Sequence, residues 1–494
     1  MMEDMVAAPQ ATSPQDAPGT PEYAARMRYA WRVCSVTSLG LILIGVNGST
    51  LNVALPEVVR HFDAGPFAAS WILLSFLLVN TASLVFFARI ADLFGRRETY
   101  LLGFAVFTLA ALLSGFAPNV WVLIALRAVQ ALGASMILAN GTVIITGAFP
   151  PDRLSEGMGV YMGTLSVAQL AGPTVGGLIA DTLGWRGVFW FNVPFGLAAL
   201  VWGLIVLRRV PRREREPVDA LGNLLIFVAL SGALVSLSEA GSGGVGPLVI
   251  GGAAAFAVLL PVLLLVERRA ANPVLDLRLF GERSLAFANL ASFCNALARS
   301  AVVLLLALYF QAVRGMNAFE AALAVLPTAV GMAIASPVAG RLGRRVRPHA
   351  LAVAGASLSA AGLLVLLVSA GPRTPYAVLA AGLFLAGCGS GAFLTGNTTQ
   401  VMSELPADRL GVVNGFRVMV MNVGIVLSVA LTLSLLTSAL TGRDKALVYA
   451  GTLSRLSPEA VEGLVTGYQR ALAALAAVAL AAIVSAALAR SRRS

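Results

Sequence analysis

The chain has 494 residues, of which 58% are hydrophobic and 12% are charged, and its formal net charge is +11. Average soluble domains carry about 25% charged residues, so the composition excludes an ordinary soluble protein and predicts an all-α polytopic membrane protein. An excess of basic residues is typical of cytoplasmic loops. We therefore expect membrane lipids, and not nucleic acid, around this chain.

Fourteen apolar stretches reach the roughly 20 residues that cross a bilayer as a helix. They begin near Val33, Ala68, Glu98, Asn119, Ser155, Arg186, Val218, Val245, Leu285, Phe319, Arg347, Pro375, Arg409 and Gly467. The preceding residues 1–30 are rich in Pro, Ala and Gln, which predicts a disordered cytoplasmic tail. The three cysteines, Cys34, Cys294 and Cys388, are too far apart in the sequence to suggest a disulfide or a metal site.

The basic residues favour one orientation. With the N-terminus in the cytoplasm, most of the 35 Lys and Arg residues fall in inner loops, and the positive-inside rule then predicts that both termini are cytoplasmic. We expect a six-helix bundle at 31–208, a linker with two additional helices and an inner-surface segment at 209–283, and a second six-helix bundle at 284–494. The Arg-rich and Lys-poor composition favours a bacterial inner-membrane protein.

The sequence contains an internal repeat. The tripeptide Asp-Arg-Leu opens the fifth stretch at 152–154 and the thirteenth at 408–410, and a glycine follows each aspartate after seven residues, at Gly159 and Gly415. A second related pair is DLFGRR at 92–97 and GRLGRR at 340–345. Two repeated halves around a midplane site are typical of secondary transporters, so we expect six helices, two helices and six helices in that order.

Five motifs in this order resemble those of the major facilitator superfamily, in its fourteen-helix drug:proton antiporter branch. They are STLNVALP at 49–56, ARIADLFGRR at 88–97, RAVQALGAS at 127–135, AGPTVGG at 171–177 and LGWRGVFWFNVPFG at 183–196. Ala88 and Ala131 stand where glycine is usual in the family. The resemblance implies the major facilitator fold, export of drugs by alternating access, and function as a monomer.

The loop motif predicts an inner gate. Asp92, Gly95, Arg96 and Arg97 can form a charge cluster that joins the helix ends of facing bundles in one state and separates in the other. The second copy of the motif has no aspartate. A matching contact there must therefore use another acid.

The antiporter motif predicts a hinge. Gly172, Gly176 and Gly177 place small residues on one helix face, and Pro173 bends the helix beside them. Small residues allow a neighbouring span to approach closely. We expect a structural role for this motif and no direct substrate contact.

Three arginines remain inside the spans, and a charge there marks a functional site by default. Arg127 belongs to the fourth-helix motif, where the resemblance implies a role in coupling or helix contact. Arg299 lies about 14 residues into its span, as does Asn47, so both are expected near the midplane. Arg299 either faces a cavity or bonds to backbone carbonyl groups. Arg417 lies about eight residues into its span and is either central or snorkels to the inner mouth.

None of the 24 acidic residues is expected at the midplane. The antiporters that this chain resembles commonly have an aspartate where Asn47 stands, and an amide has no proton to exchange. Glu57, Asp181 and Glu320 at the outer side, or Asp92 at the inner side, remain possible proton sites. The amide at position 47 therefore weakens the prediction of proton coupling, and any coupling must use one of these peripheral carboxylates.

The polar groups expected to line the cavity, besides Asn47 and the arginines, are the amides of Asn52, Gln130, Asn140, Gln169, Asn295 and Asn422. The sequence contains no motif for metal, cofactor or nucleophilic catalysis, so we expect no enzyme activity. Its favoured function is proton-coupled export of amphiphilic drugs. The alternative is a proton-independent or weakly coupled exporter or flippase that moves anionic metabolites or lipids past the midplane arginines.

Overall fold

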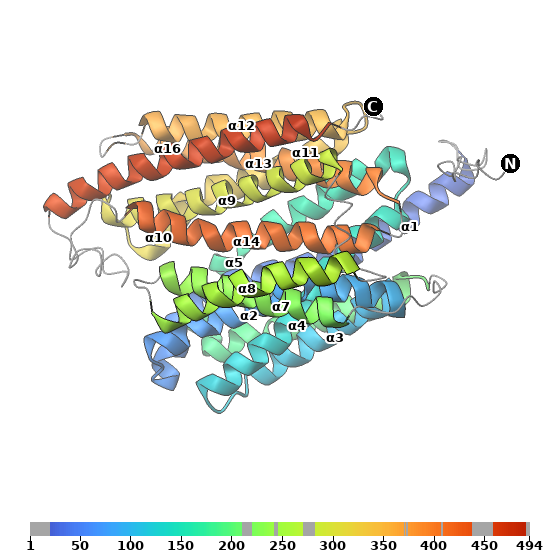
Figure 1. The fold of residues 1–494 in the computed structure, drawn as a ribbon, viewed down its shortest axis with the longest axis horizontal. Coiled ribbons are helices and arrows are strands. Elements are labelled where there is room, and N and C mark those ends of the chain that lie inside the picture. Colours follow the sequence, from blue (N-terminus) through green and yellow to red (C-terminus); the bar gives the residue numbers. More distant parts are fainter. Residues whose placement is uncertain are drawn as a thin grey trace.

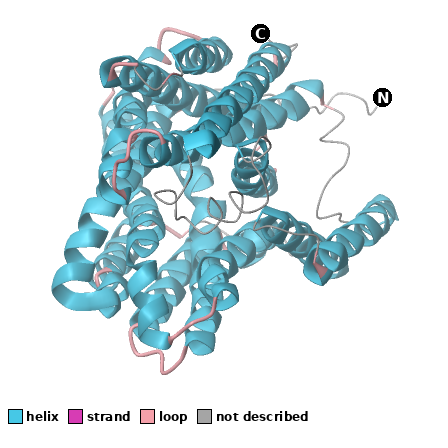
Figure 2. Ribbon diagram, turned by 90° about the vertical axis from the view of Figure 1, so that its left-hand side faces the viewer, coloured by secondary structure: helices cyan, strands magenta, loops and turns pink. Residues whose placement is uncertain are grey.

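A computed structural model describes residues 20–209, 220–241, 246–269, 282–369, 371, 374–406, 409–436 and 458–490. All regular elements in these ranges are helical (Figure 2). The N half contains α1 (Pro21–Phe62), α2 (Pro66–Phe94), α3 (Arg96–Ser114), α4 (Val120–Ala148), η2 (Pro151–Arg153), α5 (Leu154–Trp190) and α6 (Asn192–Val206). Two further helices follow, α7 (Ala220–Gly241) and α8 (Pro247–Arg269).

The C half contains α9 (Arg283–Ala312), α10 (Ala318–Ala324), α11 (Leu326–Leu342), α12 (Pro348–Ser369), α13 (Tyr376–Glu404), α14 (Leu410–Leu436) and α16 (Pro458–Leu488). The start of α9 lies next to the expected bundle boundary at 284. Most of the predicted inner-surface segment lies outside the described residues.

Eleven of the described helices are long and apolar enough to cross a membrane, so the protein is a multi-pass membrane protein. The expected number of fourteen is not confirmed.

The predicted boundary of the N-terminal tail at residue 30 is too late, because α1 already begins at Pro21. The Thr20 side chain accepts a hydrogen bond from the Tyr23 amide at 3.2 Å, Pro21 occupies the first turn, and Glu22 complements the helix dipole. These are local helix-start signals that are readable in the sequence. Residues 1–19 lie outside the described residues.

The two halves contact each other through repeat-related helices. In the N half α1 packs against α5 and α3 against α4, and in the C half α9 packs against α14 and α12 against α13. Across the halves α5 packs against α11 and α14 packs against α2. The helix α7 contacts both α14 and α2, and Figure 1 shows it beside α8. Because α5 corresponds to α14 in the repeat and α2 corresponds to α11, the same two types of helix form both contacts between the halves. The two halves therefore share one arrangement of helices.

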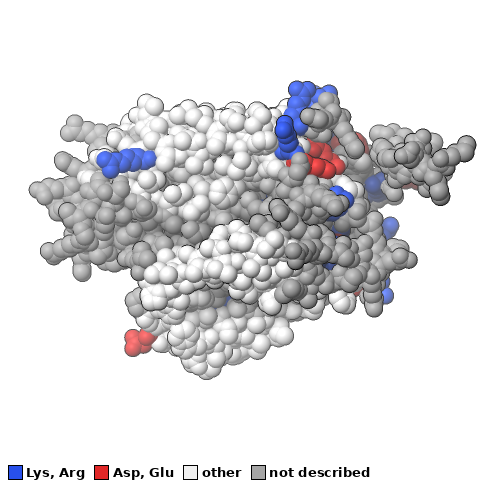
Figure 3. Space-filling model, viewed as in Figure 1, with Lys and Arg blue, Asp and Glu red and all other residues white. Residues whose placement is uncertain are grey.

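Most of the charged side chains in view gather at the end of the molecule where α1 begins and α16 ends (Figure 3), and we call this the inner end. There one apolar core crosses both halves and includes Phe149, Met158, Met332 and Val413. Towards the outer end the large clusters separate. One contains Leu51, Val58 and Trp185 of the N half, and the other contains Leu305, Phe310 and Tyr468 of the C half.

Close helix packing inside the N half depends on Gly133 of α4. A Cβ atom there would lie 2.6 Å from the Phe107 backbone nitrogen and 2.8 Å from the Gly103 carbonyl oxygen of α3. Gly133→Ala is therefore expected to reduce the free energy of unfolding by about 1–3 kcal/mol through overpacking, measured by thermal unfolding in detergent. Gly147→Ala in the same helix, which has no neighbouring atom within 4 Å, is the control. An equal loss in both variants would contradict this packing argument.

Candidate functional site

Arg127 is fully buried in the N half and is surrounded by neutral partners. Its Nη1 donates to Asn47 Oδ1 of α1 and to Gln130 Oε1, both at 2.7 Å, and its Nε donates to the Ile72 carbonyl of α2 at 3.4 Å. The guanidinium lies 4.3 Å from the centre of the Phe76 ring. Arg127 thus joins three helices, and the amide oxygen of Asn47 accepts its hydrogen bond at the position where the resembled antiporters commonly have an aspartate.

Arg417 of α14 is also fully buried, so it does not snorkel to the inner mouth. Its Nη2 donates to Asn414 Oδ1 at 3.3 Å, and Nη1 lies 3.5 Å from Met421 Sδ. Asn414 in turn donates to the Ala139 carbonyl of α4 at 2.9 Å. Through Asn414, Arg417 belongs to the contact between the two halves.

Arg299 of α9 differs from the other two arginines. Its side chain is partly exposed, and it forms no hydrogen bond or ion pair with any described residue. Its Nε, like Arg417 Nε, is buried and has no partner among the described residues. One turn earlier, Asn295 donates to Ser390 Oγ at 3.5 Å, while Asn295 Oδ1 is buried and has no partner among the described residues.

The structure does not bring the remaining predicted amides into one cluster. Asn422 bridges the halves, because its Nδ2 donates to Asn80 Oδ1 at 3.3 Å and to Thr81 Oγ1 at 3.1 Å in α2. Asn140 donates within its own helix, to the Met136 carbonyl at 2.9 Å. Gln169 is exposed on α5, and the Asn52 side chain lies outside what the structure describes.

Part of the predicted inner gate is in place. Arg96 and Asp92 form an ion pair at 3.0 Å. A Cβ atom at Gly411 would lie 3.1 Å from both Asp92 carboxylate oxygens, so this carboxylate faces the first turn of α14 in the other half. Gly95 separates α2 from α3 with a φ of 103°, a backbone conformation that favours glycine.

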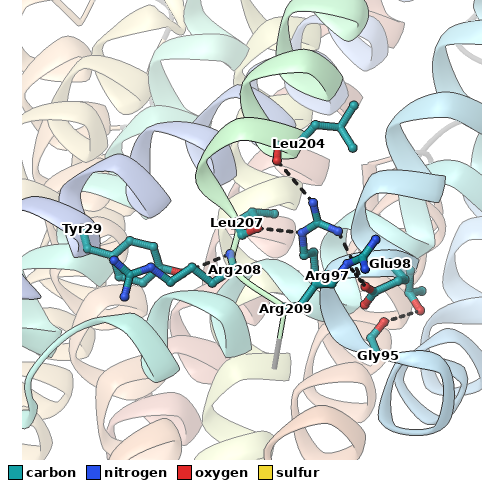
Figure 4. A network of polar contacts seen from close by, with 9 residues as sticks. Tyr29, Gly95, Arg97, Glu98, Leu204, Leu207, Arg208 and Arg209 are labelled. Carbon is teal, nitrogen blue, oxygen red and sulfur yellow. Dashed lines mark hydrogen bonds and ion pairs between the residues drawn. The ribbon is translucent and has the colours of Figure 1, made fainter. Parts of the chain in front are cut away.

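Arg97 does not take part in the contact between the halves, contrary to the prediction. Its Nε donates to the Leu207 carbonyl at 2.6 Å and its Nη2 to the Leu204 carbonyl at 3.2 Å, at the end of α6 (Figure 4). Its Nη1 also lies 3.6 Å from Glu98. Arg97 therefore satisfies the free carbonyl groups at a helix C-terminus within the N half.

Glu156 provides the acid that the second copy of the loop motif lacks. Its carboxylate lies 3.0 Å from Arg153 Nη1 and 3.3 Å from Arg344 Nε, and Arg344 follows α11 in the other half. The Glu156 side chain is only 10% exposed. Nearby, the Tyr23 hydroxyl donates to Asp152 Oδ2 at 2.6 Å. Sequence reasoning missed this residue, although it lies only two residues after the repeated tripeptide.

The two repeat-related glycines lie at the two contacts between the halves. A Cβ atom at Gly159 would lie 2.6 Å from the Ser336 carbonyl oxygen and 2.8 Å from Gly340 Cα in α11. A Cβ atom at Gly415 would lie 3.1 Å from Ala88 Cβ in α2. We call these two contacts between the halves, α5 with α11 and α2 with α14, the two seams. Both seams are closed at the inner end by direct contact of helix backbones and small side chains.

The helix runs without interruption through the antiporter motif. A Cβ atom at Gly176 would lie 2.6 Å from Thr50 Cα of α1, and Gly172 closely contacts Ser49. Gly177 lies in the same regular stretch, and the Pro173 side chain is not described. The non-helical residue of α5 is Gly184, with a φ of 69°. The backbone break thus lies beyond the expected hinge.

Two of the three predicted outer proton sites hold backbone amides. Glu57 Oε1 accepts a hydrogen bond from the Trp185 amide at 3.2 Å, directly after the break at Gly184. Glu320 forms a capping box with Asn317 at the start of α10 and is exposed. The side chain of the third, Asp181, lies outside what the structure describes.

Comparisons with known proteins agree on one family. The profile described as "Major Facilitator Superfamily" matches residues 37–429. "Multidrug resistance protein Stp" of Mycobacterium tuberculosis is 34% identical over 384 residues, which are 77% of this chain and 71% of that protein. "Riboflavin transporter RibZ" of Clostridioides difficile is 27% identical over 85% of this chain and 91% of that protein.

A similar fold occurs among solved structures. The structure titled "Crystal structure of the human organic anion transporter MFSD10 (TETRAN)" superposes with a TM-score of 0.64 at 16% sequence identity. The superposition covers 92% of this chain and 99% of that chain.

The contact between Arg127 and Asn47 predicts a specific effect on stability. Asn47→Ala removes a charge-assisted acceptor from a buried guanidinium and is expected to cost about 1.5–3 kcal/mol of unfolding free energy. Asn47→Asp keeps an acceptor and is expected to remain near wild-type stability. Thermal unfolding in detergent compares these variants with Asn140→Ala, a buried amide that bonds only within its own helix. The idea fails if Asn47→Ala and Asn140→Ala lose the same stability.

Proposed function

This chain belongs to the major facilitator superfamily, and on that premise we propose that it is a secondary active exporter of amphiphilic small molecules that works by alternating access. The family is one of membrane transporters, and the chain is not an enzyme. We further propose fourteen spans in a 6+2+6 order, both termini in the cytoplasm, and a monomer in a bacterial inner membrane.

The observation that carries the proposal is the difference between the two ends of the molecule. At the inner end the halves share an apolar core, and both seams are closed by small residues and by the side chains of Glu156 and Asp92. Towards the outer end the large cores are separate. Rocking of the halves about such a contact opens one end when the other closes. We assign the structure to the inner-closed state.

Two features support export and the class of substrate. The AGPTVGG motif at 171–177 resembles the antiporter motif of exporters, and Gly172 and Gly176 fit α5 against α1. The relative named Stp is a multidrug resistance protein, and RibZ is named a riboflavin transporter. From these two names we infer, for this chain, a substrate with an aromatic or apolar body and a polar group.

Drug:proton antiport is the version that the motif resemblance implies. A second version, with anionic or neutral cargo and no midplane proton, is favoured by the position of the acids. Within the eleven candidate spans every Asp or Glu lies within the first or last turn of its span. Asn47, at the usual aspartate position, binds Arg127 through its amide oxygen. The carboxylates of Glu57 and Glu320, at the outer side, accept hydrogen bonds from the backbone amides of Trp185 and Asn317.

A disulfide across the inner gate tests alternating access. A Cβ atom at Gly343 would lie 2.6 Å from Ser155 Cβ in the other half, which is closer than the roughly 3.5–4.5 Å found in disulfides. After a small shift apart, Ser155→Cys with Gly343→Cys, in a chain otherwise free of cysteine, should cross-link on oxidation. We expect the cross-link to abolish export from proteoliposomes and reduction to restore it, because the inner end can no longer open. Gly45→Cys with Ala168→Cys, a pair inside the N half, is the control. Full export by the oxidised gate variant would refute the mechanism.

The two coupling versions differ in their response to a proton gradient. Cationic, neutral and anionic amphiphiles are compared in proteoliposomes with the gradient imposed and then collapsed by an ionophore. Because the described spans have no acid near the midplane, the second version predicts that export of anionic amphiphiles continues at the same rate after collapse. Export of cations that stops with the gradient would instead support drug:proton antiport through a peripheral carboxylate.

A further inference from the structure

In the outer half of α9 one face is only partly buried, whereas most of the other residues there are buried. Its members recur at helical spacing in the outer half of the helix and are Arg299, Ser300, Val303, Leu304 and Ala307. The first two are polar, and neither forms a hydrogen bond to a described residue. The other three are apolar and continue towards the outer end.

The contacts of α9 show where this face points. On one side α13 contacts Ser292 and Asn295, through bonds of 2.7 Å from Ser292 to Asn397 and 3.5 Å from Asn295 to Ser390. On the other side α14 approaches Phe293 and Leu297 at Gly424. With 100° of rotation per residue, the partly buried face lies between these two sides.

These two neighbours are the helices through which the C half reaches the N half. In the described chain α13 contacts α5, and α14 contacts α2 and α4. The face therefore points towards the region between the halves, and away from α16, which packs against α9 at Tyr309 and Tyr468. On α1 a Cβ atom at Gly48, beside Asn47, would also meet no atom within 4 Å. Open space thus borders the repeat-related helix of the N half.

The electrostatic state of Arg299 identifies the chemistry that fits this face. Arg127 and Arg417 have oxygen partners within the protein, but Arg299 has none among the described residues. A guanidinium in a membrane span is costly without a partner, and carboxylate, sulfonate and phosphate groups match its fork of donors. The Ser300 hydroxyl can add one hydrogen bond to the same acidic group.

We propose that Arg299 and Ser300 bind the acidic head group of an anionic amphiphile, and that Val303, Leu304 and Ala307 bind its apolar body. This assignment of the substrate class rests on the proposed export function. It places the acidic group near the midplane and the apolar body towards the outer end, in the part of the molecule where the two apolar cores are separate.

Three probes with one alkyl chain and different head groups test the site: decanoate, decanamide and decyltrimethylammonium. Binding to the full chain in phosphatidylcholine nanodiscs is measured by calorimetry, with empty nanodiscs subtracted. We expect decanoate to bind tightest. Arg299→Gln should weaken decanoate binding about tenfold or more, the loss of a charge-assisted contact, with little change for decanamide. Arg299→Lys should retain part of the affinity, because it keeps the charge but lacks the fork of donors.

The control is Arg60→Gln, which removes the same charge from an exposed position at the outer end of α1 and should leave decanoate binding unchanged. If Arg299→Gln binds decanoate as tightly as wild type, or if wild type does not prefer decanoate to the other two probes, the proposal is overturned. Nanodiscs of phosphatidylglycerol identify the source of the anion. Weaker decanoate binding there shows that a lipid head group occupies the same site, and unchanged binding shows that the site selects free anions.

Unfolded protein is recognised separately. Retained decanamide binding and retained cross-linking of the Ser155/Gly343 cysteine pair show that an Arg299 variant has the native fold. The experiment measures binding and needs no transport cycle. Loss of the anion preference therefore overturns the site alone, whereas continued export by the cross-linked gate variant overturns the proposed function.

Discussion

The close approach of helix backbones between the two halves is the constraint on which the rest of this structure depends. In a bilayer the lipid tails are as apolar as the helices, so association relies on tight packing and on polar contacts between small residues. Gly159 and Gly340 provide this packing at one seam, and Gly415 with Ala88 provides it at the other. The shared core and the ion pair of Glu156 with Arg344 lie beside these crossings.

The three arginines inside the membrane show three solutions to one electrostatic problem. Arg127 uses side-chain and backbone oxygens of three helices, and Arg417 uses a neighbouring asparagine that belongs to the contact between the halves. Arg299 keeps its donors free of described partners. Because the described midplane has no carboxylate, the interior carries positive charge. This property favours anionic or neutral cargo over cationic cargo in the second version of the proposed function.

The two seams have different surroundings. The seam between α2 and α14 continues past the inner contacts through Asn422 with Asn80, and then through Leu78 and Val426, against which Val235 of α7 packs. In the described part of the chain no added helix packs over the seam between α5 and α11. The additional helix pair therefore makes an otherwise repeated architecture asymmetric.

The sequence by itself determined the membrane class, the helical segments, the internal repeat and the arginine-rich inner end. These follow from hydrophobic length, charge distribution and short motifs, which act locally along the chain. It also pointed to Arg127, Arg299 and Arg417, because charges in apolar runs stand out. Only the tertiary structure decided that Arg97 bonds to the end of α6, that Glu156 meets Arg344, and that Arg417 is buried. These partners lie far apart in the chain, so the packing of whole helices determines which residues meet. No local sequence pattern predicts these contacts.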